Sequence, residues 1–110
     1  GAPAYSNPVC RFYGTPGVGP NSHFYTGFPS ECTYIQSTDP GWLFEGLAFN
    51  VVMPEAGICR QGFKPIFRAY NGLAALNDSN HRYTVDAFEY HRMLQAGWQP
   101  EGPVMCAVND

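Results

Sequence analysis

Three short blocks of this sequence recur in the same order 56 to 58 positions later. The first block carries Arg-x-Tyr, the second carries His-x-Tyr-Thr, and the third carries Gly-Trp followed by Glu-Gly. The matching blocks are Pro8–Tyr13 with Pro65–Tyr70, Ser22–Thr26 with Asn80–Thr84, and Gly41–Gly46 with Gly97–Gly102. Similarity at a fixed period is typical of a repeated supersecondary unit. The sequence therefore predicts one domain over residues 1–110 that contains two tandem copies, at about 8–53 and 64–108.

Each copy is expected to fold as strand, strand, helix, strand. The first two blocks of each copy are short and rich in aromatic residues, and a loop of Gly, Pro, Asn and Asp separates them, which indicates an antiparallel hairpin. The closing strands are expected over 47–53 and 103–108. The predicted fold class is therefore α+β, with an antiparallel sheet and two helices.

The helix of the second copy has clear boundary signals. Asp86 can act as its N-cap with Glu89 as capping-box partner, although Thr84 is an alternative cap. Ala87, Tyr90 and Leu94 then share one face, and Gly97 stands where a helix often stops. In the first copy, Ser30 is expected to cap one or two turns that continue to Ile35 and end before Asp39-Pro40-Gly41.

Composition excludes several classes of function. Only 14% of the residues are charged, the formal net charge is −3, and the six Lys and Arg residues are scattered. Nucleic-acid binding and electrostatic membrane attachment both depend on clustered cations, so neither is expected. No apolar run approaches the length of a membrane span.

Four cysteines stand at positions 10, 32, 59 and 106, without a C-x-x-C pair or zinc-finger spacing. An even count in a small domain favours disulfides in an oxidising compartment, although spacing alone leaves three pairings open. The alignment of the two copies favours one of them. Cys10 aligns with Phe67 and Cys32 aligns with Tyr90, so a strand–helix contact in the second copy would become a disulfide in the first. The expected bridges are then Cys10–Cys32 and Cys59–Cys106.

These motifs resemble a repeat of unknown function that is common in secreted bacterial proteins. Its usual form has a Tyr-Arg-Leu-Tyr-Asn strand, then His-Phe-Tyr-Thr, a helix ending in Gly-Trp, and Tyr-Glu-Gly-Val-Ala-Tyr. The resemblance covers nearly the whole chain in two copies. Such repeats often accompany extracellular hydrolases, so the resemblance implies a secreted or cell-surface accessory module without catalytic activity. The chain departs from the pattern at Gly14, at Arg82, and at Pro100 and Pro103.

Residues that occur in both copies are expected to serve the fold. Each Arg can pair with the Glu of its own copy, and each His can bond to that Glu or to a backbone carbonyl. The alternative is that the charged groups form the floor of a binding pocket and that the aromatic rings stack on sugars. The residues expected to have structural roles are Arg11, His23, Tyr25, Trp42, Glu45, Arg68, His81, Tyr83, Trp98 and Glu101.

Residues without a counterpart are the better candidates for binding a ligand. This set combines aromatic side chains with polar side chains of the long loop in the second copy. It consists of Tyr5, Phe28, Tyr34, Phe63, Asn71, Asn77 and Asp78. No cofactor is expected, and the acids and His near the second helix fit neither an EF-hand nor an H-E-x-x-H site.

The expected function is a non-catalytic extracellular module that binds a polysaccharide or another polymer surface and is joined to a secreted enzyme or surface protein. The alternative is a protein-interaction or protease-inhibitor domain that presents residues 16–20 or 73–76. A small hydrolase that uses a His and a Glu is a third hypothesis, but no nucleophile motif accompanies these residues.

Overall fold

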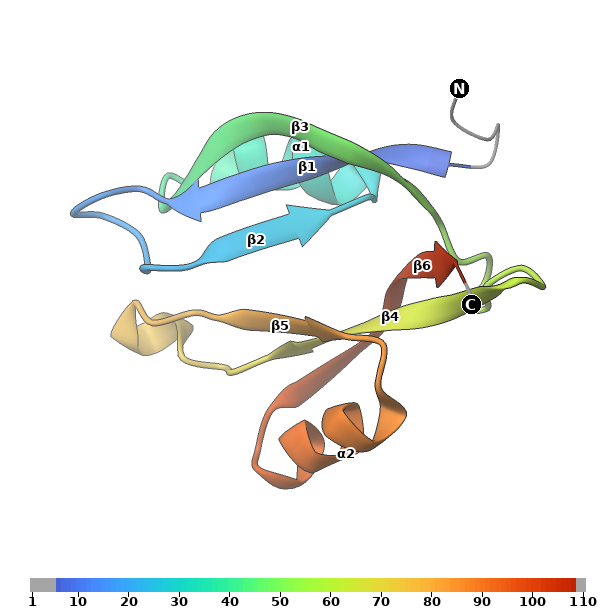
Figure 1. Cartoon of the computed structure of the whole chain (residues 1–110). Helices are drawn as coiled ribbons and strands as arrows, with labels where there is room; N and C mark the ends of the chain where they lie inside the picture. Colours follow the sequence, from blue (N-terminus) through green and yellow to red (C-terminus); the bar gives the residue numbers. More distant parts are fainter. Residues whose placement is uncertain (1–5, 109–110) are drawn as a thin grey trace.

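The computed structural model describes residues 6–108, which form an α+β fold with one curled antiparallel sheet (Figure 1). The elements are β1 (Ser6–Gly14), β2 (His23–Thr26), α1 (Pro29–Thr38), β3 (Trp42–Val52), β4 (Phe63–Tyr70), the 3-10 helix η1 (Ala74–Leu76), β5 (His81–Thr84), α2 (Ala87–Gln95) and β6 (Gln99–Val108). We call β1 to β3 with α1 the first half, and β4 to β6 with α2 the second half.

The strand order in the sheet is β2-β1-β3-β6-β4-β5. In the first half β1 pairs with β2 and β3, and in the second half β4 pairs with β5 and β6. The two halves join where Val52 of β3 pairs with Cys106 of β6. The sheet curls so that β2 and β5, the two ends of this order, lie side by side in the middle of the molecule (Figure 1).

Both hairpins have the same register. Arg11 lies opposite Tyr25 and Tyr13 lies opposite His23, as Arg68 lies opposite Tyr83 and Tyr70 opposite His81. Because side chains alternate between the faces of a strand, each Arg, His and Tyr set falls on one face of its half.

A bulge at each Glu-Gly pair places the Glu beside the Arg. In the first half Phe12 pairs with Phe44 and Arg11 pairs with Gly46, so Glu45 is the extra residue. Gly46 has φ 108°, a conformation that favours glycine. In the second half the register shifts around Glu101, and Gly102 has φ 76°. The extra residue of a bulge redirects the side chain of Glu toward the Arg. The residue after it has a positive φ, which explains why Gly follows each Glu.

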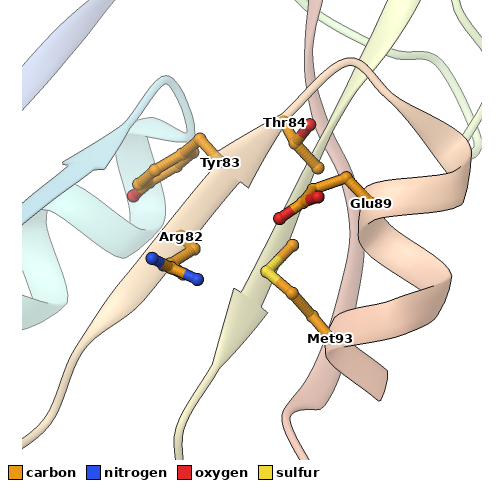
Figure 2. A pocket seen from close by; sticks show the side chains of 5 residues that line it. All are labelled: Arg82, Tyr83, Thr84, Glu89 and Met93. Atoms are coloured by element: carbon orange, nitrogen blue, oxygen red, sulfur yellow. The ribbon is translucent and has the colours of Figure 1, made fainter. Parts of the chain in front are cut away.

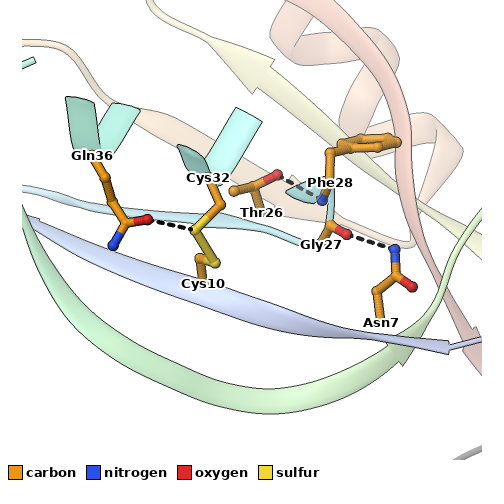
Figure 3. Close-up of a disulfide and its surroundings, with 7 residues drawn as sticks. All are labelled: Asn7, Cys10, Thr26, Gly27, Phe28, Cys32 and Gln36. Atoms are coloured by element: carbon orange, nitrogen blue, oxygen red, sulfur yellow. Dashed lines mark hydrogen bonds between the residues drawn. A yellow bond between two sulfur atoms is a disulfide. The ribbon is translucent and has the colours of Figure 1, made fainter. Parts of the chain in front are cut away.

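The two disulfides are those that the sequence predicts. Cys10 on β1 is bonded to Cys32 on α1 (Figure 3). Both side chains are buried in a cluster with Phe12 and Phe24. Cys59 is bonded to Cys106 on β6.

At the corresponding place in the second half, the rings of Phe67 and Tyr90 stack with centroids 4.6 Å apart. A strand–helix contact is therefore a disulfide in one half and an aromatic pair in the other, as the alignment predicts.

The α2 helix starts as predicted, because the Asp86 carboxylate accepts from the backbone N–H groups of Phe88 and Glu89. Its buried residue is Met93, whereas on the predicted face Tyr90 and Leu94 are half-buried and Ala87 is exposed.

The α1 helix differs more from the prediction. It begins at Pro29 and continues to Thr38, so Ser30 lies inside the first turn and is not the N-cap. Proline is favoured at the first helical position because its φ suits a helix and its missing N–H would have no partner there. The closing strands also begin earlier than predicted, at Trp42 and Gln99, because their first residues pair with β1 and β4.

Candidate functional site

The charged cluster of the first half lies on an open surface. Glu45 Oε1 is 3.2 Å from Arg11 Nε and 3.5 Å from His23 Nε2. The ring of Tyr13 lies against His23 with centroids 4.6 Å apart. The side chains of Arg11 and His23 are 42% and 47% exposed. The Arg–Glu and His–Glu contacts agree with the pairing that the sequence predicts.

The corresponding cluster of the second half is buried. Glu101 Oε1 accepts a hydrogen bond from Arg68 Nε at 2.6 Å and is 3.3 Å from His81 Nε2. Only 6% of the Arg68 side chain and 12% of the His81 side chain are exposed. The ring of Tyr70 stacks on His81, as Tyr13 does on His23.

A helix of the other half covers this second cluster. Arg68 donates from Nη1 and Nη2 to both carboxylate oxygens of Glu31 on α1, at 3.0 and 3.1 Å. Its guanidinium also lies over the ring of Phe24, 4.8 Å from the centroid. A planar guanidinium matches a carboxylate in this two-bond geometry, so the contact fixes α1 against β4.

The charges in this cluster shift one another's pKa values. Burial alone would lower the pKa of Arg68, but the hydrogen bonds and charge of Glu31 outweigh it and raise this pKa. Burial alone would raise the pKa of Glu101, but the neighbouring His81 and the charge of Arg68 outweigh it and lower this pKa. Both groups are therefore charged at neutral pH.

Tyr83 joins the two halves beside this cluster. Its hydroxyl donates to the carbonyl of Tyr25 at 2.7 Å and accepts from the Tyr25 N–H at 2.9 Å. Burial raises the pKa of Tyr83 to about 12, although the nearby Arg68 acts in the opposite direction.

A cleft of about 220 Å³ opens at this junction between the halves. Carboxylates, an imidazole and aromatic rings line it, and it receives residues from α1, β2, β3, β4, β5 and β6. The lining residues are Phe24, Glu31, Tyr34, Ile35, Asp39, Trp42, Arg68, His81 and Glu101. We call this the junction cleft.

The predicted ligand-binding residues do not gather in one place. Tyr34 lines the junction cleft and is 67% exposed. Phe28 is partly buried and packs against the cluster that contains Val9 and Val104, outside the junction cleft. Phe63 is half-buried at the start of β4, far along the strand from the cleft residue Arg68. Tyr5 lies outside the described residues.

The polar candidates of the 71–80 loop hold that loop together. The side chain of Asn71 donates to the carbonyl of Asp78 and accepts from the backbone N–H groups of Leu73 and Asn80. Asn77 is exposed, and its side chain donates to the carbonyl of Val18 in the first half. These contacts favour a structural role for Asn71 and Asn77.

Sequence reasoning missed Glu31, Asp39 and Ile35 as cleft residues. Glu31 aligns with Glu89 when the two helices are matched, but Glu89 bonds to Arg92 outside the cleft, so this match gave no signal for the cleft. Trp42, predicted to be structural, packs against the core and also lines the cleft. Trp98 instead lies under the guanidinium of Arg82, 5.5 Å from its ring centroid.

Two other hollows lie outside the junction cleft, and the first of them also receives residues from both halves. One of about 280 Å³ is lined by Tyr25, Phe49, Ile66, Tyr83 and Met105 and is mainly apolar. The other, of about 290 Å³, lies between β5 and α2 (Figure 2). Its lining residues are Arg82, Tyr83, Thr84, Glu89 and Met93.

Residues 6–108 contain no group of three or more His, Cys, Asp or Glu side chains placed to hold a metal ion. None of the helices described in this range has the length and apolar character needed to cross a membrane. The two disulfides indicate an extracellular environment.

Comparison with known proteins finds no match among curated proteins and none among solved structures. One protein family does match, over residues 2–108, and it is described as a domain of unknown function, DUF5648. Since the match spans nearly the whole chain, the protein belongs to the DUF5648 family.

Proposed function

We propose that this domain is a non-catalytic extracellular module that binds a polysaccharide or another polymer surface at the junction cleft. The observation that carries the proposal is the lining of the cleft, which combines Tyr34 and Trp42 with the carboxylates of Glu31 and Glu101. Aromatic faces contact the apolar faces of sugar rings, and fixed carboxylates accept hydrogen bonds from hydroxyl groups.

The cleft is held in place before a ligand arrives. Arg68 fixes Glu31 and Glu101 through charge-assisted hydrogen bonds, and the Cys10–Cys32 bridge anchors α1 to β1. Fixed groups lose little conformational freedom on binding, which favours affinity. A volume of about 220 Å³ is smaller than a drug-sized pocket and suits one ring or side group of a polymer.

A binding role is favoured over acid catalysis. Glycoside hydrolysis needs one carboxyl group that keeps its proton near neutral pH. The pKa of Glu101 is lowered by His81 and Arg68 despite its burial, which is the opposite of what that role requires.

We also infer that the two halves derive from one duplicated unit, as the sequence predicts. Three correspondences support this inference: the element order, the hairpin register and the Arg–Glu–His contacts. An attached catalytic domain or surface protein would then use this module to stay on its substrate.

Retention on insoluble polymers tests the proposed function. Oxidised protein is incubated with chitin, cellulose, peptidoglycan and a polyester, and reduced, unfolded protein serves as the control. Tyr34→Ala should lower retention by about 10-fold, since one stacked ring contributes on the order of 1 kcal/mol beyond its burial. Phe88→Ala is the matched control, because Phe88 is also an exposed helical aromatic, at 81%, but lies on α2 outside the cleft. Equal retention of both variants would remove the cleft from the proposal.

A protein-interaction or inhibitor role is the second candidate, and one observation favours it. The loops at 16–20 and 73–76 lie together, since Asn77 bonds to Val18, and they expose Val18 and Leu76 at 54% and 74%. Leu76→Ser should then weaken binding to a protein partner or inhibition of a protease, with polymer retention unchanged.

A further inference from the structure

The junction cleft presents more negative charge than positive charge. Three carboxylates line it, those of Glu31, Asp39 and Glu101, against the single guanidinium of Arg68. The imidazole of His81 adds a charge only when it is protonated.

The positive charge is also the part that a ligand cannot reach. Arg68 is buried with 6% of its side chain exposed, whereas the side chains of Glu31 and Glu101 are 31% and 28% exposed. Both contacts of Glu101 with Arg68 and His81 use Oε1, so its Oε2 can accept from an incoming donor. An approaching molecule therefore meets carboxylate oxygens.

The aromatic walls of the cleft suit a cation as well as a sugar ring. The ring of Phe24 already carries the guanidinium of Arg68 at 4.8 Å, which demonstrates this kind of contact inside the cleft. Trp42 and the exposed Tyr34 offer two more rings beside the carboxylates. A cation that meets both a ring face and a carboxylate is stabilised by both.

From these charges and rings we infer that the ligand of the junction cleft is a polysaccharide whose sugars carry free, protonated amino groups, such as a de-N-acetylated hexosamine polymer. This inference rests on the proposed function and names the chemical class of its ligand. An ammonium group would contact Glu101 and Asp39, and the apolar face of its ring would lie on Tyr34 or Trp42. An acidic polysaccharide would be repelled by the same carboxylates.

The test compares soluble oligosaccharides that differ in one group. Binding to the glucosamine tetramer, the N-acetylglucosamine tetramer and a galacturonic acid tetramer is measured by calorimetry at pH 6 and at two salt concentrations. The amino form should bind about 10-fold more tightly than the acetylated form and weaken as salt is added, because salt screens exposed charges. The galacturonic acid form should not bind.

Asp39→Asn tests the cleft with little risk to the fold, since an Asn oxygen can still accept from the Gly41 N–H as Asp39 does. It should weaken binding of the amino tetramer about 3-fold, in the range of an exposed ion pair, without changing binding of the acetylated form. Glu55→Gln is the matched control, because Glu55 loses the same charge in an exposed pair with Arg60 outside the cleft.

Each outcome is decisive. Equal binding of the amino and acetylated tetramers would overturn this inference and leave the proposed function standing. Preference for the acidic tetramer would overturn it too, as would an equal effect of Asp39→Asn and Glu55→Gln. A lysine-rich peptide that binds as tightly as the amino tetramer would also overturn the inference, because the cleft would then recognise positive charge without a sugar ring. Failure to bind any oligosaccharide or insoluble polymer would remove the proposed function itself.

Discussion

The two Arg–Glu–His clusters have the same local contacts and opposite surroundings. Arg11 and Glu45 lie on an open face, whereas Arg68 and Glu101 lie under α1. The hairpin register and the Glu-Gly bulge set the local contacts in both halves. Burial of each Arg depends instead on which residues of the opposite half cover it. The same motif therefore forms an exposed ion pair in the first half and a buried network around Arg68 in the second.

The residues that receive the guanidinium explain this difference. In the first half Phe24 and Glu31 hold Arg68. At the matching positions of the second half stand Arg82, which lies over Trp98, and Glu89, which bonds to Arg92. A cation replaces an aromatic ring, and the carboxylate already has a partner. Among the described residues, the second half therefore has no equivalent place for Arg11, which contacts Glu45 of its own half.

Replacing each Arg in turn gives the largest expected contrast between the halves. Arg68→Ala would remove a buried cation and leave the partly exposed carboxylates of Glu31 and Glu101 without it. The loss of stability should be about 3 kcal/mol, at the lower end for breaking a buried ion pair, because water can still solvate these carboxylates. Arg11→Ala removes an exposed pair and should cost no more than about 1 kcal/mol. Urea unfolding of the oxidised proteins, followed by tryptophan fluorescence, measures both. Similar losses would mean that burial does not distinguish the clusters.

The contact between the first strand and the helix of each half provides a second test of how the two halves differ. Phe67→Cys/Tyr90→Cys should form a third disulfide, because these residues occupy the place of Cys10 and Cys32. Oxidation of the new pair should stabilise the variant by about 3 kcal/mol relative to its reduced form, in the range of loops of this length. Thiol titration after folding reports whether the bond forms. A folded variant with two free thiols would show that the strand–helix geometry differs between the halves.

Alkaline pH tests the contact between β2 and β5. Burial raises the pKa of Tyr83 to about 12, above its ordinary value of about 10. The unfolded chain loses this proton first, so the stabilisation is complete below about pH 10 and is lost as pH rises from about 10 to 12. The expected loss is roughly 2–3 kcal/mol, since each pKa unit corresponds to about 1.4 kcal/mol.

Unfolding measured between pH 9 and 11.5 should show this decline, with Tyr34→Phe as the control for an exposed tyrosine. Tyr83→Phe should flatten the decline and lower stability at neutral pH, because the Tyr25 N–H and carbonyl lose their partner. A pH profile that is the same with and without the Tyr83 hydroxyl would contradict the assigned burial.

The features that the sequence predicted correctly are those formed by nearby residues or by blocks that recur in both halves. The paired blocks predicted the hairpins and the Arg–Glu pairs, a local capping signal predicted the Asp86 cap, and the alignment of Cys10 with Phe67 predicted the disulfide pairing. These features depend on neighbours in the chain or on matching blocks that can be aligned with each other.

The junction cleft could not be predicted, because it depends on how one half lies on the other. Nothing near Glu31 in the sequence indicates that it bonds to a residue 37 positions away. Asparagine-rich loops such as 71–80 are typical of ligand contacts, but Asn71 uses its side chain to close its own turn. Phe28 has no counterpart in the second half, yet it packs against a buried cluster formed by Val9 of the first half and Val104 and Met105 of the second.

The short pairing between β3 and β6 has a consequence for handling the protein. Within residues 6–108 these strands meet at Val52 and Cys106, so most of each strand has a free edge. Along β6, Pro100 and Pro103 offer no N–H to an added strand. The stretch 43–49 of β3 has no proline and exposes four large apolar side chains, those of Leu43, Phe44, Leu47 and Phe49. In a concentrated or partly reduced sample, aggregation is expected to begin along this edge.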